Sequence, residues 1–355
     1  NNVIREEGNS KVYFVKSTSS IISKHDAGIV NDVKIPIDIL KFTHYIKKLI
    51  ASEIYDLIHI QEPYVGGLVR HPVKVTTIHD TSYGEIKSIL RTSITRYGAK
   101  KIVFYTTLGY FMEYSSVCTS KLVIVPSSQI RDEIRYAYGI KNKEVVIIPN
   151  GINPPNPNEP SKEEARKTLR IDREIVVFTL AQHIPRKRLD DLIKAANILR
   201  DKWREKVLII IGGTGPLTQY LKKMVIETNV HDFIKFTGWI PESEIPLYYR
   251  AADIFVITSE YEAGPITLLE AAIRGLAIVC TKIPGFPALM RDYVDGIKYP
   301  IGNWKKLAEI LENLFKDEEL RRRLSMNAIS FAKRFTWDRI ARLTLAAYKR
   351  ALTLS

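Results

Sequence analysis

Short apolar runs alternate with helix-length segments over most of the chain. Nearly continuous runs of apolar residues are typical of strands buried on both faces of a parallel sheet, and the alternation with helices predicts an α/β protein. In the first half the runs cover residues 11–16, 55–60, 73–78, 122–126 and 145–149. In the second half they cover residues 175–180, 207–211, 234–237, 254–257 and 277–280.

A breaker-rich segment separates these two series of strands. Asn150-Gly151 is followed by Pro-Pro-Asn-Pro-Asn-Glu-Pro at 154–160, the clearest linker signal in the chain. A length of 355 residues favours two domains, each large enough for its own core. Near the end, apolar residues at helical spacing follow Thr336, a residue type that caps helices. The predicted division is a Rossmann-like unit at 1–153, a second at 154–335 and a helix at 336–355.

The charge composition favours anionic partners but does not distinguish between the classes of them. The chain has 53 Lys and Arg against 39 Asp and Glu, and its formal net charge of +14 attracts nucleotide sugars, phospholipid surfaces or nucleic acid. Since no helix-turn-helix, zinc or stacked-aromatic motif accompanies the charge, we expect no nucleic acid. Cys118 and Cys280 are expected to be buried thiols. Without a signal peptide or an apolar run near the ~18 residues that span a bilayer, we expect a cytoplasmic protein, soluble or peripheral on the membrane.

The most informative motif follows the predicted strand at 254–257. It reads SEYEAGPITLLE over residues 259–270, so Glu262 and Glu270 stand at the two ends of an E-x7-E spacing. Ligands of open α/β sheets bind at the carboxyl ends of strands, and N–H groups at the start of a helix favour anions. Two carboxylates here can reach into one crevice, where they can accept hydrogen bonds from sugar hydroxyls.

The stretch 251–299 resembles the donor-binding block of retaining glycosyltransferases of the GT-B fold, in the large E-x7-E family (family four-like, group one). The resemblance covers nearly the whole chain, and it is specific in the second domain and loose in the first. It implies two Rossmann-like domains that face a central cleft, with the C-terminal helix crossing back to the first domain. It also implies a UDP- or GDP-linked sugar as donor, no required cofactor or metal ion, and retention of anomeric configuration.

The resemblance also assigns roles to residues of the second domain. Lys187, within AQHIPRKR at 181–188, would offset charge on the leaving diphosphate. Glu262 would hold the transferred sugar, and Glu270 the ribose hydroxyls. The other donor-binding candidates are Gly213 and Gly264 in turns, Ile240 against the base, and Ile266 and Thr267, whose amides would cradle the diphosphate.

Two positions depart from the family pattern. Gln182 stands where a phosphate-binding arginine is usual, and a glutamine carries no charge. Arg186 or Arg188 could replace that arginine from the other side of Lys187. Pro265 has no N–H, so a backbone donor that could face the ligand is lost. These departures leave a catalytically weakened scaffold open as an alternative, and a sugar-nucleotide epimerase of the same architecture is another.

The first domain contributes a candidate from the other side of the cleft. His79 lies in TTIHD at 76–80, at the carboxyl end of a predicted strand, where α/β sites form. By the resemblance His79 would bind hydroxyls of the donor sugar, so that His79, Lys187 and Glu262 are the predicted catalytic residues. Asp80 is expected to orient a loop or to begin a helix.

The segment 86–112 carries basic residues and no acidic one. It could lie against an anionic membrane, with neighbouring aromatic residues at the interface. Ile89, Leu90 and Val103 favour the alternative of two core helices with a solvated face. In lipid-modifying members of such families the first domain holds the acceptor, so a lipid-linked or membrane-presented acceptor is expected. The basic residues are Lys87, Arg91, Arg96, Lys100 and Lys101.

The first residues predict a further element before the chain's start. Residues 1–8, NNVIREEG, read as the end of a helix that stops at a glycine cap. The run 11–16 resembles the second strand of the family's first domain. We therefore expect a preceding strand and a glycine-containing loop, about two dozen residues in all.

Overall fold

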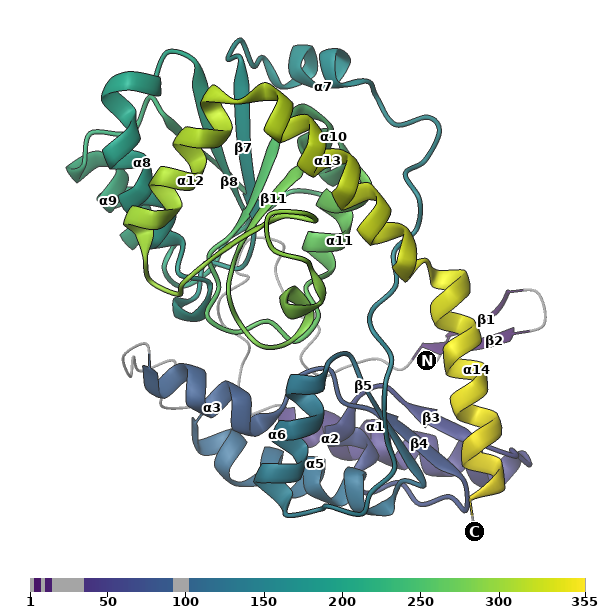
Figure 1. The fold of residues 1–355 in the computed structure, drawn as a ribbon. Coiled ribbons are helices and arrows are strands. Elements are labelled where there is room, and N and C mark those ends of the chain that lie inside the picture. The colour runs from purple at the N-terminus through teal and green to yellow at the C-terminus, as the bar shows by residue number, and fades with distance from the viewer. Residues whose placement is uncertain (1–2, 8–9, 15–34, 92–101, 355) are drawn as a thin grey trace.

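The computed structural model describes residues 3–7, 10–14, 35–91 and 102–354, with side chains from residue 39 onward except that of Arg91. Two parallel sheets lie in separate halves of the molecule, each accompanied by helices (Figure 1). The linker after residue 148 runs from one half to the other. This arrangement places the carboxyl ends of both sets of strands toward the space between the halves.

The first sheet has the order β3-β4-β5-β6. All four positions of β4 and of β5 are buried, which explains why these strands read as continuous apolar runs. The strands are β3 (Ile58–Ile60), β4 (Lys74–Thr77), β5 (Leu122–Val125) and β6 (Val145–Ile147). The helices are α1 (Ile35–Ser52), α2 (Pro63–Gly66), α3 (Ser82–Arg91), α5 (Leu108–Thr119) and α6 (Ser128–Tyr138).

The second sheet has the order β12-β11-β10-β7-β8-β9, and all its registered pairs are parallel. The sequence predicted every strand except β12, a three-residue edge strand. The strands are β7 (Ile175–Leu180), β8 (Val207–Gly212), β9 (Ile234–Gly238), β10 (Ile254–Ile257), β11 (Ala277–Thr281) and β12 (Ile297–Tyr299). The helices are α7 (Lys162–Leu169), α8 (Leu189–Trp203), α9 (Thr218–Glu227), α10 (Ile245–Ala251), α11 (Ile266–Ile273), α12 (Trp304–Lys316) and α13 (Glu318–Ala332).

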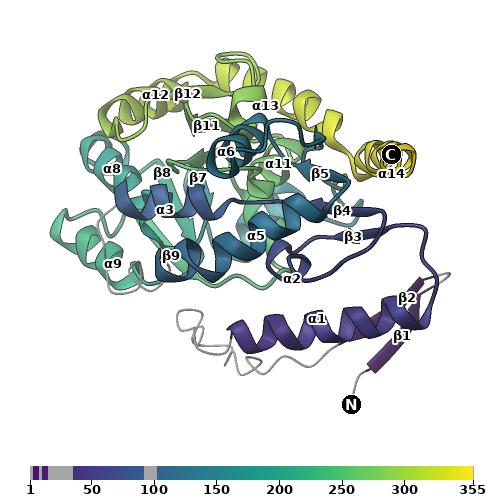
Figure 2. The same cartoon turned by 90° about the horizontal axis from the view of Figure 1, so that it is seen from below.

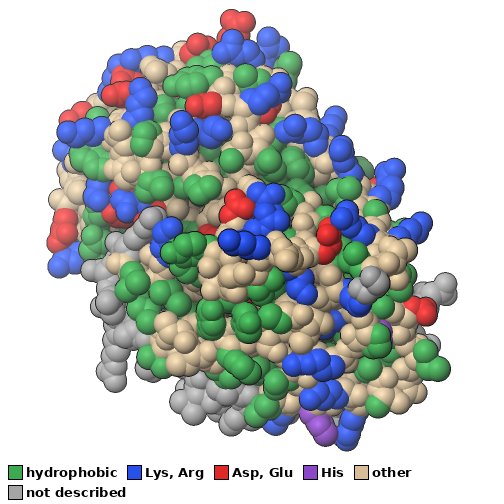
Figure 3. Space-filling view, turned by 60° about the horizontal axis from the view of Figure 1, so that its bottom comes forward, with side chains coloured by type: hydrophobic (Ala, Val, Ile, Leu, Met, Phe, Trp, Pro, Cys, Tyr) green, Lys and Arg blue, Asp and Glu red, His purple; other side chains and the backbone are tan. Residues whose placement is uncertain are grey.

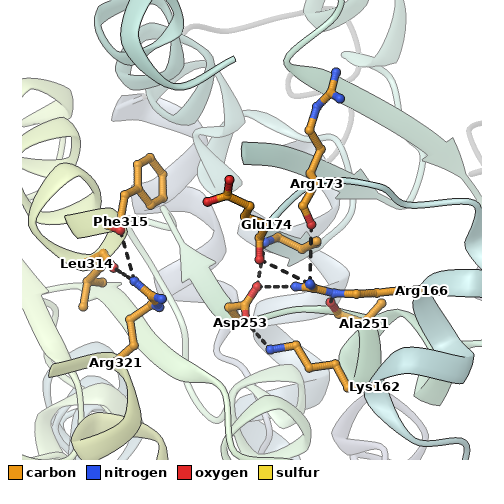
Figure 4. Close-up of polar contacts among 10 residues, drawn as sticks. Lys162, Arg166, Arg173, Glu174, Ala251, Asp253, Leu314, Phe315 and Arg321 are labelled. Carbon is orange, nitrogen blue, oxygen red and sulfur yellow. Dashed lines mark hydrogen bonds and ion pairs between the residues drawn. The ribbon is translucent and has the colours of Figure 1, made fainter. Parts of the chain in front are cut away.

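A polar network fastens α7 to the amino-terminal end of the second sheet (Figure 4). Asp253, just before β10, accepts hydrogen bonds at 2.7 Å from the Arg166 guanidinium and from the backbone N–H of Val176. Lys162 pairs with the same carboxylate. Because this network lies at the end of the sheet away from the cleft, it stabilises the domain without entering the site.

The last helix, α14 (Trp337–Thr353), returns to the first domain. Its Ile340, Ala347 and Ala351 share a core with Val75 and Leu122 of the first sheet. Figure 1 shows the helix running from the second half of the molecule down along the first. The predicted crossing helix is therefore confirmed.

The expectation of a helix end in the first residues is wrong. Residues predicted to end a helix form β1 (Val3–Glu7), which pairs antiparallel with β2 (Ser10–Phe14) in a separate two-stranded sheet. β2 is a strand, as predicted, but it does not join the parallel sheet. A hairpin satisfies the backbone hydrogen bonds of both segments locally, whereas a parallel partner needs a crossover. Figure 2 shows this hairpin at the edge of the molecule.

Three side chains expected in the interior lie at the surface. Cys118 is exposed, whereas Cys280 is buried as predicted. Leu90 and Val103 are 58% and 63% exposed, so they do not serve as core positions. The helices that carry these residues have apolar side chains on more than one face. The packing of the helices in the fold decides which of these faces is buried. The described part of segment 86–112 therefore presents apolar side chains to the outside.

Candidate functional site

The second sheet reverses its strand order between β7 and β10, which are neighbours. Ligands of open α/β sheets bind beyond the carboxyl ends of strands at such a reversal. The loops after these two strands hold each other: the Thr258 hydroxyl donates to the Lys187 carbonyl, and the Glu260 N–H donates to the Arg186 carbonyl at 3.0 Å. The two motifs singled out in the sequence therefore meet at this place.

Lys187 and Glu262 form a buried ion pair at the centre of the site. Lys187 Nζ donates to Glu262 Oε1 at 2.5 Å, and the Ser259 hydroxyl donates to the same oxygen at 2.6 Å. Only 8% of Glu262 is exposed. Burial by itself would raise the pKa of Glu262, but the charges of Lys187 and Arg186 hold that pKa below its usual value. The carboxylate is therefore ionised and suited to accept hydrogen bonds.

The first domain contributes a carboxyl to the same cluster. Asp80 follows His79 at the end of β4, and burial raises the pKa of Asp80 to about 6. Arg186 and Lys187 oppose that rise, whereas Glu262 adds to it. The sequence predicted only a loop or helix-start role for Asp80. The only sequence feature that could have indicated a site role for Asp80 is its position directly after His79 at the end of a strand.

Arg186 joins the two domains. Its guanidinium Nη2 lies 3.4 Å from Oε1 of Glu85 on α3, and its guanidinium carbon lies 5.7 Å from the centre of the Tyr261 ring. Burial would lower the pKa of Arg186, but the carboxylates of Glu85, Asp80 and Glu262 raise it. Its guanidinium charge is therefore shared with acidic partners from both domains.

Arg186 and Arg188, the two candidates for replacing the usual phosphate-binding arginine, are both engaged by acidic residues in this arrangement. Gln182 is exposed. Arg188 donates to Asp191 at 2.7 Å and lies 3.8 Å from Glu260, so its charge is already balanced. Arg186 is held by Glu85. The geometry therefore does not support the expectation that either arginine replaces the missing charge.

The start of α11 forms the other wall of the switch point. Pro265 precedes the helix, and Ile266 and Thr267 are its first two residues, as the sequence predicted. Gly264 lies against the linker, because Asn150 Nδ2 donates to its carbonyl at 2.7 Å. Glu270 Oε2 accepts a hydrogen bond from the Tyr249 hydroxyl at 2.9 Å.

Two other predicted donor-binding residues shape the turns beside β7. Gly213 has a φ of +105°, and a side chain there would collide with the Ala181 carbonyl. Glycine is therefore required at this close approach. Ile240 is only 5% exposed and belongs to the core cluster of the second domain, whereas its neighbour Trp239 is exposed.

His79 is exposed at the end of β4, on the side of the first domain. Its Nε2–H donates to Gln61 Oε1 at 3.1 Å. Desolvation lowers the pKa of His79, so the ring is neutral at neutral pH. Gln61 Nε2 in turn lies 3.4 Å from Nε2 of His59. The other ring nitrogen of His59, Nδ1, lies 2.6 Å from the hydroxyl of Tyr348 on α14. No local sequence pattern indicates these supporting residues, because they come from separate elements.

The expected membrane face is only partly described. Lys87 is exposed on α3, with its ammonium 5.7 Å from the centre of the Tyr83 ring. Arg91 ends the helix, whereas Arg96, Lys100 and Lys101 lie outside the described residues. Figure 3 shows hydrophobic side chains with Lys and Arg, and few acidic ones, over the lower half of the molecule. Among the helices that the structure describes, none is long and apolar enough to cross a membrane.

Comparisons with protein families match both halves of the chain. The family described as Glycosyltransferase Family 4 matches residues 22–155, and the one described as Glycosyl transferases group 1 matches residues 161–331. An uncharacterized glycosyltransferase of Methanocaldococcus jannaschii is 25% identical over 86% of this chain and 78% of its own. The alpha-monoglucosyldiacylglycerol synthase of Streptococcus pneumoniae is 26% identical over 89% of this chain and 74% of its own.

Solved structures share the fold. Sucrose-phosphate synthase from Thermosynechococcus elongatus superimposes with a TM-score of 0.77 at 20% identity, over 99% of this chain and 86% of its own. The Anabaena protein HepE, solved in complex with UDP, has a TM-score of 0.68 at 19% identity, over 87% of this chain and 82% of its own.

Proposed function

Because the chain belongs to the glycosyltransferases of the GT-B fold, by the family 4 and group 1 matches of its two halves, we propose that it transfers a hexose from a UDP- or GDP-linked sugar to a lipid-linked or membrane-presented glycan, with retention of configuration. The observation that carries this proposal is the Lys187–Glu262 pair at the switch point of the second sheet. A cation for a diphosphate and an anion for sugar hydroxyls stand side by side there.

The chemistry of the pair suits departure of a nucleotide diphosphate. The Lys187 ammonium can offset the charge that grows on the diphosphate as the sugar leaves, and the N–H groups at the start of α11 can add to this. Glu262 is ionised and can accept hydrogen bonds from sugar hydroxyls, and Glu270 is proposed to do so from the ribose. In this proposal Lys187 and the backbone amides supply the stabilising charge, and no metal ion is required.

The opposite side of the cleft is proposed to contact the transferred sugar. His79 is neutral, and since its Nε2–H is directed to Gln61, its Nδ1 is left as an acceptor for a sugar hydroxyl. The Streptococcus pneumoniae enzyme is named for a glycolipid product, which supports a lipid acceptor. HepE was solved with UDP, which supports a nucleotide-linked donor. The exposed Lys87, Leu90 and Val103 support presentation of that acceptor at a membrane.

Turnover of radiolabelled UDP- and GDP-sugars tests this function. The protein is incubated with each donor and with a membrane lipid extract, and the lipid products are separated, with the anomeric configuration of the new bond determined by NMR. We expect label in a lipid fraction from one class of donor, with the donor's configuration retained. An isomerised nucleotide sugar formed without any acceptor would indicate an epimerase instead, and no conversion of any donor would favour a catalytically weakened scaffold.

A further inference from the structure

The loop that carries Glu262 is anchored in the first domain. Tyr261 and Ala263, the two neighbours of Glu262 in the chain, are 6% and 4% exposed and belong to a core cluster of that domain. We propose that insertion of Tyr261 into the first domain positions Glu262 for the sugar of the donor. The buried first-domain members of the cluster are Ile78, Val117, Val123, Val125, Ile130, Ile134 and Tyr138.

The Tyr261 ring ends in a socket formed by Thr81, Gly84 and Glu133, at α3 and α6. Its hydroxyl donates to Glu133 Oε2 at 3.0 Å, and the Thr81 hydroxyl donates to the same oxygen at 2.5 Å. Gln129 donates to the other oxygen of Glu133 at 2.8 Å. Burial and the charge of Glu133 raise the pKa of Tyr261, so its hydroxyl keeps the proton that it donates. The carboxylate that receives Tyr261 is therefore itself held by first-domain side chains.

Gly84 of α3 makes room for the ring. A Cβ at this position would collide with the Tyr261 hydroxyl, and it would lie 2.7 Å from the ring carbon Cζ and 2.8 Å from Glu133 Oε2. Such contacts are too short, since carbon atoms pack at about 3.5–4.0 Å. Glycine is a weaker helix former than alanine, so space for the ring accounts for its presence in α3. A larger residue at position 84 would displace Tyr261.

The backbone after Glu262 is also held from the first domain. The Gly264 carbonyl accepts a hydrogen bond from Asn150 Nδ2 at 2.7 Å, and a Cβ at Gly264 would lie 3.1 Å from Cβ of Pro126, just after β5. The side chain of Glu262, in contrast, pairs with Lys187 of the second domain. The place of this carboxylate therefore depends on both domains.

This dependence concerns the sugar more than the nucleotide. In the proposed function the nucleotide contacts, Glu270 and the start of α11, belong to the second domain, whereas Glu262 binds the transferred sugar. Packed supporting residues lock a site residue in its working geometry, and a misplacement of about 1 Å can lower a rate about 10²-fold. Tyr261 is thus a positioning residue. Its role rests on the proposed function, but its docking can be measured without turnover.

Thermal unfolding of the full chain without ligand tests the docking. The proteins are wild type, Gly84→Ala, Tyr261→Ala and the double variant. In wild type the added methyl group displaces the ring, so Gly84→Ala should lower the Tm by about 3 °C or more. In the Tyr261→Ala background the methyl group has room, and the Tm should not fall further. An equal fall in both backgrounds, or none in wild type, would overturn the socket.

A milder pair keeps this test decisive if Tyr261→Ala does not fold. Tyr261→Phe lacks the hydroxyl, which is the atom nearest to a Cβ at Gly84. Gly84→Ala should therefore lower the Tm less in the Tyr261→Phe background than in wild type. The same fall in both would again exclude the socket.

Isothermal titration with UDP, UDP-glucose, GDP and GDP-mannose tests the positioning. Loss of hydrogen bonds to a charged group should lower the affinity for a nucleotide sugar, relative to its nucleotide diphosphate, about tenfold in Gly84→Ala and Tyr261→Ala. The affinity for the nucleotide diphosphate itself should not fall. Two controls should keep the wild-type ratio: Tyr220→Ala, which removes an exposed ring on α9, and Ile193→Val, which loosens the separate core of the second domain.

The two measurements separate this inference from the proposed function. If the melting temperatures are coupled but the affinity ratio is unchanged, Tyr261 docks without positioning Glu262, and the inference is wrong. If transfer from a nucleotide sugar occurs with an unchanged ratio, the proposed function stands alone. If no nucleotide or nucleotide sugar binds the wild type, the proposed function and the positioning role both fail, and coupled melting temperatures would leave only the docking.

Discussion

At the scale of single residues, the buried Lys187–Glu262 pair carries the strongest expectation. Lys187→Ala and Glu262→Ala should each lower turnover by at least ~10²-fold, because each removes a group suited to charge or hydroxyls at the reacting centre. Glu270→Ala should act mainly on nucleotide affinity. The measurement is the steady-state rate of transfer from the identified donor. Unchanged rates in folded Lys187 and Glu262 variants would remove both residues from the site.

A stability control belongs with those variants, since either single change leaves one buried charge without its partner. Loss of one member of a buried pair is destabilising by about 3–5 kcal/mol. The double variant Lys187→Met/Glu262→Gln removes both charges and should melt at a higher temperature than Lys187→Ala. A low rate in this more stable protein shows that the chemistry, and not the fold, was lost.

A substitution at Gln182 should strengthen nucleotide binding, whereas the substitutions at Lys187 and Glu262 should lower activity. Gln182→Arg places a cation at an exposed position beside the site, where the family usually has an arginine. A hydrogen bond to a charged group contributes about 1.5–3 kcal/mol, so we expect the affinity for the nucleotide diphosphate to rise about tenfold. Isothermal titration with UDP and GDP measures it, and Gln182→Met is the control without charge. Equal affinity in both variants would place residue 182 away from the diphosphate.

At the scale of elements, the start of α3 depends on a buried acid of α5. Glu113 Oε2 accepts from the backbone N–H and the hydroxyl of Ser82 at 2.9 and 2.6 Å. Burial raises the pKa of Glu113 to about 7, although the Ser82 hydrogen bonds oppose the rise. α3 carries Glu85, the partner of Arg186, so this acid supports the contact between the domains.

The raised pKa of Glu113 should be visible in how the free energy of unfolding depends on pH. The folded pKa lies above the usual 4.5, so between these values the folded chain binds more protons and loses stability as pH rises. From pH 4.5 to 7 the loss is about 3 kcal/mol. Glu113→Gln keeps an acceptor for Ser82 but cannot ionise, and should abolish this part of the slope. Urea unfolding at pH 5 and pH 8 measures it.

The comparison of the two proteins removes the contribution of other groups. Burial lowers the pKa values of His59 and His183 to about 4, so these residues increase stability as pH rises toward 6.5. Both are present in wild type and variant, and their effect cancels in the difference. If the difference between the proteins does not change with pH, Glu113 is not protonated in the folded state.

At the scale of the whole molecule, the charge of +14 predicts reversible attachment to anionic membranes. Each basic side chain near such a surface contributes ~1 kcal/mol, and salt weakens the attraction. Flotation with anionic and neutral liposomes is the measurement. We expect weaker flotation with anionic liposomes when the five basic residues of segment 86–112 are changed to glutamine. They are Lys87, Arg91, Arg96, Lys100 and Lys101.

A charge-matched control separates a specific face from overall attraction. Five exposed basic residues of the second domain are changed to glutamine in a second protein: Lys222, Lys223, Lys235, Arg322 and Arg323. The net charge falls equally in both proteins. Equal flotation by the two variants would mean that no particular face binds, and equal flotation of wild type with neutral and anionic liposomes would point to a soluble acceptor.

The sequence by itself determined the two series of strands, the break between them and the crossing helix. Buried parallel strands need continuous apolar runs, and linkers need proline and glycine, so both signals are local. It also determined that Lys187 and Glu262 follow strands of one sheet, since each motif directly follows its strand. The sequence did not predict β12, because a strand of three residues carries too little pattern. It did not predict β1, because residues 1–8 also fit the end of a helix and the pairing with β2 decides for a strand.

Only the tertiary structure decided which charges meet. The partner of Arg186 is Glu85 in the other domain, and the environment of Asp80 is made by Lys187 and Glu262 across the cleft. Nothing in the local sequence around Arg186 distinguishes it from Arg188, whose partner is one turn away on α8. Burial and charge partners depend on how two domains are placed, and that placement is set by contacts between residues far apart in the chain.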